Sequence, residues 1–376
     1  MTEVSVAGVG LHPFGRFDEK STTDMGAVAV RAALDEADVH DRSGFQATFC
    51  GTAYGGVAAA HKVLSRLSLT GGPIVDVEAG CASGAAALML GASAIRAEQY
   101  DTVLVLGIEK MPKGIIRSSF FEPWREEAGL AATPAYFALR AQRLMRESDL
   151  TKHDLATVVV KNRANGVRNP DAMFRKAVTA EDVMASRVVC EPLHLWMLCS
   201  PNEGAAAIVL RRDQRAAIRL RAAVLRSHLP GNVLDESTPL SGLVDDDIPS
   251  ATTLAADAAY EDTGLGPDDL DLVECQDTDA ARELLAYEEL RLCGKGDSGA
   301  LLRSGHTQAD GRLPVNVSGG LLSKGEPLGA SALAQVIELV RQLRGEAGGR
   351  QIVDARVGLA HTVGRGANAS VTIVSS

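Results

Sequence analysis

The sequence predicts an α/β fold made of two similar halves. Near residue 75 the order of elements is a strand, a glycine-rich turn, a small-residue helix and an apolar strand. The same order returns near residue 315, where a strand at 315–317 precedes Gly319-Gly320, a helix from Ala330 and a strand at 357–359. Each half also closes on an alanine-rich apolar strand, at 204–210 and at 369–374.

Alternating strands and helices favour helices on the faces of a mostly parallel sheet, and a duplicated unit favours two such sheets packed together. The alternative is that any α/β chain looks faintly repetitive. Four elements in matching order favour duplication. Loops at corresponding strand ends should then converge, and ligands of α/β sheets bind at such places.

The first half is expected to cover residues 1–215. Its elements are a strand at 4–10 that ends in the turn His12-Pro13, helices at 23–37, 57–69 and 83–97, and strands at 45–52, 73–77 and 102–107. From residue 112 to about 195 the apolar pattern loosens, although helices are expected at 134–147 and 152–163. We interpret this stretch as an inserted loop domain that covers one face of the sheet.

The second half is expected to cover residues 216–376. A strand at 218–228 is followed by a loop at 229–250, which is rich in Pro, Gly, Asp and Ser. The remaining elements are helices at 251–262, 280–292 and 330–344, and strands at 270–274, 357–359 and 369–374.

Composition excludes several classes of protein. The 376 residues are 46% hydrophobic with a net charge of −10 and no basic block, so nucleic acid is not an expected partner. No apolar run reaches the length of a membrane span, and the N-terminus lacks a signal-peptide pattern. The six cysteines are scattered without a CxxC pair, which predicts a reduced, cytoplasmic protein with no metal site.

The turn at Gly80-Cys81-Ala82-Ser83-Gly84 is the strongest candidate for a reactive site. It lies between an apolar strand and a helix, where free backbone N–H groups and the helix dipole favour a thiolate. Gly80 and Gly84 would let a substrate or another backbone come close. The other interpretation is that Cys81 is one more buried, small apolar residue.

At these residues the chain resembles the thiolase superfamily, and within it the thiolase-like part of the sterol carrier protein X group, often labelled lipid-transfer proteins. The resemblance runs nearly end to end and rests on five stretches in matching order. These are 80–84, 106–111, 200–207, 316–330 and 360–364, with a helix end at 342–348 typical of the group. The sequence ends at Ser376, so the small C-terminal sterol-carrier domain of some relatives is not expected.

The resemblance implies a five-layered αβαβα fold of two fused halves, usually a homodimer. It also implies acyl transfer between CoA thioesters, with no tightly bound cofactor and with coenzyme A as part of the substrate. Cys81 would attack an acyl-CoA or a 3-ketoacyl-CoA to form a thioester on the enzyme. The resemblance further places Ser323, Lys324, Gly319 and Gly364 beside the coenzyme.

Two positions depart from the family pattern. The glycine-rich loop of the family usually reads Gly-His-Pro, and here Glu326 replaces the activating histidine. A carboxylate beside Cys81 would oppose ionisation of the thiol. Gln276 stands where the group has a histidine, and it can donate a hydrogen bond to an oxyanion but cannot act as a base. His361 is kept in the last loop.

Three functions follow. The first is an acetyl-CoA C-acyltransferase-like enzyme of lipid or sterol side-chain metabolism, with Cys81 as nucleophile, His361 as acid/base, Glu326 as acid/base or modulator and Gln276 as oxyanion donor. The second is a carbon–carbon lyase, a retro-aldolase on a 3-hydroxyacyl-CoA that works with an OB-fold partner. There Glu326, Asp277 or His361 would serve as base and Cys81 would be incidental. The third is a non-catalytic subunit that binds CoA thioesters.

Other candidates have ordinary interpretations. Cys199 and Cys275 lie near strand ends and are expected in the core rather than in a site. The basic residues near 110–125 and 161–175 would either meet CoA phosphates or form a common charged surface.

Overall fold

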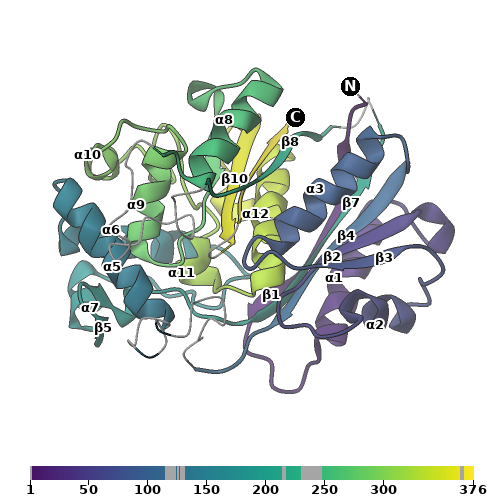
Figure 1. Cartoon of the computed structure of the whole chain (residues 1–376), viewed down its shortest axis with the longest axis horizontal. Helices are drawn as coiled ribbons and strands as arrows, with labels where there is room; N and C mark the ends of the chain where they lie inside the picture. The colour runs from purple at the N-terminus through teal and green to yellow at the C-terminus, as the bar shows by residue number, and fades with distance from the viewer. Residues whose placement is uncertain are drawn as a thin grey trace.

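The structure is a computed structural model that describes residues 2–114, 124, 127, 132–213, 217–229, 248–364 and 368–376. In the first half (Figure 1), the strands are β1 (Ser5–Gly15), β2 (Ala47–Gly51), β3 (Ile74–Val77), β4 (Thr102–Lys110) and β7 (Glu203–Arg211). The helices of this half are α1 (Thr22–Glu36), α2 (Ala59–Arg66) and α3 (Ser83–Arg96).

In the second half, the strands are β8 (Arg219–Ser227), β9 (Leu272–Glu274), β10 (Val357–Gly364) and β11 (Asn368–Ser375). Its helices are α8 (Ala251–Thr263), α9 (Ala280–Glu289), α10 (Ser298–Arg303), α11 (Gly320–Lys324) and α12 (Leu328–Leu343).

The strands of the two halves follow the same plan. They are ordered β3-β2-β4-β7-β1 in one half and β8-β11-β10-β9 in the other, joined where Ser5 of β1 meets Arg219 of β8. β2 is parallel to β4 as β9 is to β10, and the next two pairs in each half are antiparallel. The matching order supports duplication. The expectation of a mostly parallel sheet was wrong, because β7 and β11 each run antiparallel to both of their neighbours.

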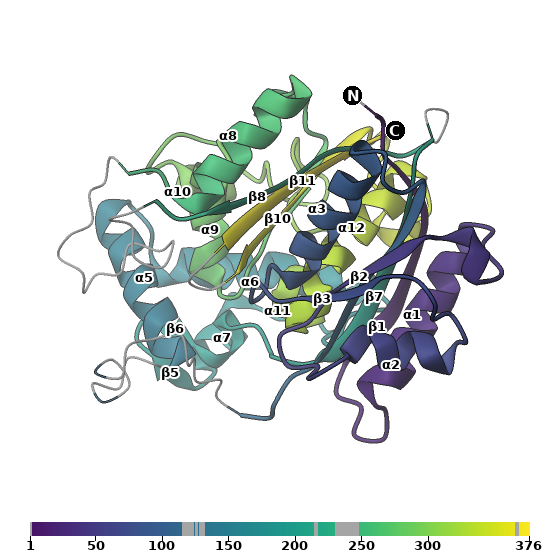
Figure 2. The same ribbon diagram turned by 45° about the vertical axis from the view of Figure 1, so that its right-hand side comes forward.

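The helices form the remaining layers (Figures 1 and 2). α3 and α12 pack against each other in the centre, where α12 contacts both β4 and β10, and α3 contacts both β4 and β8. α1 and α2 cover the outer face of the first half, and α8 covers β8 and β11 of the second. The predicted five-layered thiolase-type α/β fold is therefore confirmed.

Glycines bring the central helices close together. A Cβ on Gly84 of α3 would lie 2.6 Å from the carbonyl oxygen of Gly329 in α12, and one on Gly107 of β4 would lie 2.2 Å from the same oxygen. Because Gly84 has no side chain, another backbone can approach it, as predicted, and the helix that follows the cysteine turn packs closely against α12.

Two predicted elements differ from the structure. β1 continues through His12 and Pro13 to Gly15 instead of turning there, because a register irregularity between His12 and Gly15 lets the strand keep its pairing with β7. The strand expected at 315–317 is reduced to a single bridge between Val315 and Val273. Asn316 has a φ of 57°, which is outside the β region and ends the ladder.

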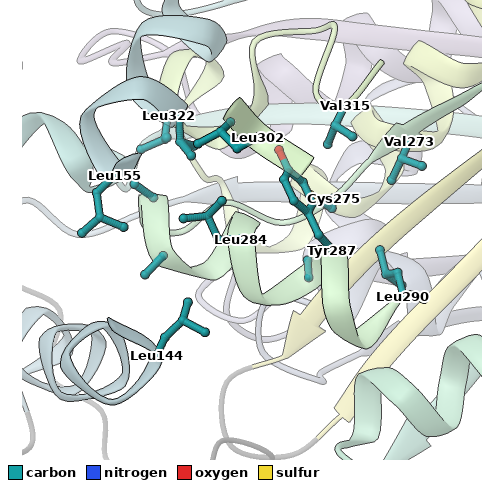
Figure 3. Close-up of a cluster of buried hydrophobic side chains, with 14 of the residues drawn as sticks. Leu144, Leu155, Val273, Cys275, Leu284, Tyr287, Leu290, Leu302, Val315 and Leu322 are labelled. Carbon is teal, nitrogen blue, oxygen red and sulfur yellow. The ribbon is translucent and has the colours of Figure 1, made fainter. Parts of the chain in front are cut away.

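The inserted stretch contributes α5 (Thr133–Glu147), α6 (Lys152–Val167), α7 (Ala180–Ala185), β5 (Val188–Cys190) and β6 (Leu193–His194). Figure 3 shows how it joins the second half, since Leu144 of α5 and Leu155 of α6 belong to one apolar cluster with Leu284 and Tyr287 of α9. Most of the loop predicted at 229–250 lies outside the described residues. Within the described ranges, every helix is too short or too polar to cross a bilayer.

Candidate active site

A cavity of 1260 Å³ lies where the loops of both halves and the inserted stretch meet. Its wall includes Cys81 from the turn before α3, Gln276 and Thr278 from the loop after β9, and Glu326 from the loop between α11 and α12. The loops that the repeated strand order predicted to converge therefore do converge.

Cys81 sits on this wall at the entry to α3. The residue is 7% exposed, and helix α3 begins two residues later at Ser83. Gly80 holds a φ of 59°, and the Ser83 hydroxyl accepts a hydrogen bond from the Ala79 N–H (2.8 Å) and donates one to the Gly80 carbonyl (2.6 Å). These bonds fix the tight turn, so the cysteine faces the cavity beside the positive end of the helix.

Glu326 is held from two sides. Its Oε1 accepts a hydrogen bond from Gln276 Nε2 at 2.8 Å, and its Oε2 accepts one from Cys199 Sγ at 3.3 Å. Gln276 is itself oriented, because its side-chain oxygen accepts a bond from the backbone N–H of Val363. The structure thus brings Cys81, Gln276 and Glu326 to one cavity, with the Gln276 amide directed at the carboxylate.

Cys199 is a site residue that the sequence interpretation missed. It lines the cavity, and burial together with the neighbouring Glu326 carboxylate raises its pKa well above the usual range of a thiol. Cys199 is therefore a neutral thiol that donates to Glu326. Its place directly before Ser200-Pro201-Asn202, a stretch that resembles the family, was the signal available. Cys275 does belong to the core (Figure 3), as predicted.

His361 lies on β10 and is not among the residues that line the cavity. It is fully buried, its Nε2 lies 3.1 Å from the Thr252 hydroxyl, and its Nδ1 has no hydrogen-bond partner within the described part of the chain. Thr252 also accepts a bond from Arg282 (3.4 Å), which does reach the cavity wall. Burial, and then the positive charge of Arg282, lower the pKa of His361 well below 6.5. The His361 side chain is therefore neutral and lies behind the residues that line the cavity.

The buried imidazole predicts a pH dependence of stability. Below pH 6.5 the unfolded chain binds a proton on His361 that the folded chain does not, because burial depresses the folded-state pKa. The free energy of unfolding should therefore fall as the pH drops below 6.5, by up to about 1.4 kcal/mol per pH unit. When urea unfolding is measured at a series of pH values, the free energy of unfolding of His361→Gln should fall less steeply with decreasing pH than that of the wild type. Replacement of the exposed His61 by glutamine is the control, and an unchanged slope in His361→Gln would contradict the assignment.

The four residues expected beside coenzyme A lie in the packing beneath the cavity. Ser323 donates to the Asn162 carbonyl (3.0 Å), and the buried Lys324 ammonium is 3.5 Å from Glu274. Gly319 has a φ of 96° and packs against Gly166, and a Cβ on Gly364 would lie 2.1 Å from the Ala79 carbonyl. None of these four residues lines the cavity, and their contacts instead hold the loops around it in place.

Asp277 fixes the glycine-rich loop from below. Its carboxylate accepts hydrogen bonds from the backbone N–H groups of Leu321 (2.5 Å) and Leu322 (3.2 Å), at the start of the short helix α11. Burial and the neighbouring Glu283 raise its pKa well above the usual value of an aspartate. Asp277 is not on the cavity wall, so its place is structural.

Basic side chains gather on the part of the wall formed by the inserted stretch. Arg163, Arg175, Lys176 and Arg187 all line the cavity. Across the described ranges, histidine, cysteine and acidic side chains form no group of three suited to a metal ion. The arrangement offers a thiol at a helix start, a carboxylate held by an amide and a second thiol, and a cationic rim. It suits covalent chemistry on an anionic substrate.

Comparisons with known proteins agree with this fold. Residues 4–214 match the family described as "Thiolase, N-terminal domain", and residues 243–376 match "Thiolase C-terminal domain-like". The chain is 36% identical over 394 residues to an acetyl-CoA acetyltransferase of Methanothermobacter thermautotrophicus, with 100% of both chains covered. It is 34% identical over 398 residues to sterol carrier protein 2 of Oryctolagus cuniculus, covering 99% of this chain and 72% of the relative.

Among solved structures, the Ltp2-ChsH2(DUF35) aldolase superposes with a TM-score of 0.86 at 23% identity, covering 100% of this chain and 98% of the other. At this identity the likeness shows the fold. A fold of two similar α/β halves with a cysteine at their junction defines a thiolase-type protein. The chain belongs to the thiolase family, in the group that includes the sterol carrier proteins.

Proposed function

We propose that the chain is a thiolase-type acyltransferase that acts on acyl-CoA or 3-ketoacyl-CoA thioesters through an acyl-enzyme on Cys81, in lipid or sterol side-chain metabolism. The observation that carries the proposal is the position of Cys81, at the entry to α3 and on the wall of a 1260 Å³ cavity that also contains Glu326. The acetyltransferase relative, matched over its whole length, supports the reaction class.

In the proposed reaction with an acyl-CoA, the sulfur of Cys81 attacks the carbonyl carbon of the thioester. A bond forms between that sulfur and the carbonyl carbon, and the bond from the carbon to the CoA sulfur breaks. The thiol proton of Cys81 passes by way of Glu326 to the leaving CoA sulfur. Splitting the transfer into two steps lowers each barrier. The Gln276 amide, fixed by Val363, supplies a donor for the developing oxyanion.

The proposal gives His361 a different task from the one expected. Because Thr252 connects His361 to Arg282, the imidazole positions that cavity arginine instead of meeting the substrate. Proton transfer then falls to Glu326, whose carboxylate reaches the cavity wall.

The proposal is tested by intact-protein mass spectrometry after mixing with a panel of acyl-CoAs. The wild type should gain the mass of the acyl group, and Cys81→Ala should gain nothing. Cys293→Ala, at a cysteine outside the cavity wall, should form the adduct like the wild type. If no acyl-CoA of the panel forms an adduct with the wild type, the acyltransferase proposal is wrong.

A carbon–carbon lyase is the second candidate, and Glu326 favours it. A carboxylate held by the Gln276 amide is suited to take the proton of a 3-hydroxyl group. The aldolase with the same fold is named Ltp2-ChsH2(DUF35), which supports a partner protein as part of this alternative. A lyase would keep most of its cleavage activity in Cys81→Ala, whereas an acyltransferase would lose its activity in that variant.

We further propose that the chain forms a homodimer in the cytoplasm. It would have no tightly bound cofactor, and coenzyme A would enter only as part of the substrate. Binding of CoA thioesters without any turnover or adduct, in the presence of a partner, would instead identify a non-catalytic binding subunit.

A further inference from the structure

Arg163 is a buried cation without an acidic partner among the residues that the structure describes. It belongs to α6, is 7% exposed, and lines the cavity. Among the described residues it forms neither a salt bridge nor a hydrogen bond, and its Nε is buried without an acceptor. A guanidinium group carries five N–H donors, and leaving such a group buried and unpaired is costly. A structural role alone does not account for this cost.

The surroundings of Arg163 orient the group toward the cavity. Its guanidinium carbon lies 4.1 Å from the ring centre of Phe174, which covers one face of the planar group and leaves its N–H edge for a ligand. Phe174 is fixed in turn, because its backbone N–H donates to the Ser323 carbonyl at 2.9 Å. Burial lowers the pKa of Arg163 to about 10, so the group still carries its charge at neutral pH.

Of the other cavity cations, Arg282 is buried but is paired with Glu289, and three further ones are placed differently. Arg175, Lys176 and Arg187 are exposed where they line the cavity, so they are suited to the strongly hydrated phosphates of coenzyme A. Arg163 is buried against the Phe174 ring, where a planar carboxylate fits the two parallel N–H bonds of a guanidinium.

We propose that Arg163 binds a carboxylate at the far end of the substrate's acyl group, which makes the substrate a CoA thioester of a dicarboxylic acid. The inference rests on the proposed function, because it assumes that a CoA thioester occupies the cavity with its acyl carbon at Cys81. It adds a specificity determinant to that function. A charge-assisted, bidentate contact in an apolar setting corresponds to a preference of about 10- to 100-fold over a neutral acyl group.

The test compares dissociation constants, measured by isothermal titration calorimetry, for dethia analogues in which a methylene group replaces the thioester sulfur. Dicarboxylic acyl groups of increasing length are paired with neutral acyl groups of the same carbon number. In the wild type the dicarboxylic ligand should bind about 10- to 100-fold more tightly at the preferred length. Arg163→Met should abolish this preference, and Arg163→Lys should keep part of it.

Free coenzyme A and the neutral analogues should bind Arg163→Met within about twofold of the wild type, which also shows that the variant is folded. Arg175→Gln should instead weaken coenzyme A and all analogues alike. An equal loss of coenzyme A and dicarboxylic analogues in Arg163→Met would place a CoA phosphate on Arg163 and overturn the proposal. Equal binding of charged and neutral analogues by the wild type at every length would overturn it without any variant. Failure of the wild type to bind coenzyme A or any analogue would count against the proposed function itself.

Discussion

Glu326→Gln is expected to lower turnover of the preferred CoA thioester by roughly 10²- to 10⁴-fold, the usual contribution of a general acid or base. Glutamine keeps the size of the side chain and can still accept the hydrogen bond from Gln276, so the loop that carries it should keep its shape. What is lost is the carboxylate on the cavity wall that we propose takes and returns a proton. The amide of the new glutamine would also direct an N–H donor toward the Cys199 thiol, whereas the Glu326 carboxylate accepts a hydrogen bond from that thiol.

The measurement is steady-state kinetics with the acyl-CoA that labels Cys81 most rapidly. The effect should fall on kcat with KM nearly unchanged, because the carboxylate acts on the reacting proton and not on the body of the substrate. Glu147→Gln, at an exposed carboxylate of α5, is the matched control and should leave both constants at the wild-type values. A Glu326→Gln enzyme with wild-type turnover would remove this residue from the chemistry.

Lys161→Met is expected to destabilise the fold by about 3–5 kcal/mol, the usual cost of breaking a buried ion pair by removing one partner. The Lys161 ammonium lies 2.8 Å from Glu283, and both side chains are fully buried. Asn162 donates to Glu283 (2.6 Å) and to Asp277 (2.8 Å), so the two carboxylates are neighbours. Without the lysine, this buried acidic pair loses its cation.

Chemical denaturation followed by circular dichroism measures this change. Arg291→Met breaks the exposed ion pair with Asp257, whose side chains are 54% and 50% exposed, and should cost less than about 1 kcal/mol. The double replacement Lys161→Met and Glu283→Gln should recover part of the loss, since it removes the stranded charge together with its partner. If Lys161→Met costs no more than Arg291→Met, the buried cluster does not stabilise the loops of the site.

The site was predicted in part because some of its residues lie within contiguous motifs. Cys81 follows a strand and precedes a helix, and this local order already places it at a helix start. Glu326 and Gln276 were found by comparing two loops with the family pattern. Cys199 was not, because its importance depends on Glu326, which is 127 residues away in the chain. The burial of His361 was not predicted either, because a residue on an apolar strand can face either a cavity or a helix layer.

The sequence by itself determined the two-half α/β fold, most of its longer strands and helices, the family, and Cys81 beside the start of α3. The elements follow from local apolar patterns and glycine positions, which act over a few residues, whereas the family follows from the resemblance of five motifs to the thiolase pattern. Only the tertiary structure decided which side chains share the cavity. The hydrogen bonds to Glu326 come from loops of both halves, and the inserted stretch brings the buried, unpaired Arg163 to the same wall. Such contacts depend on how distant segments pack, and no local pattern in the chain encodes them.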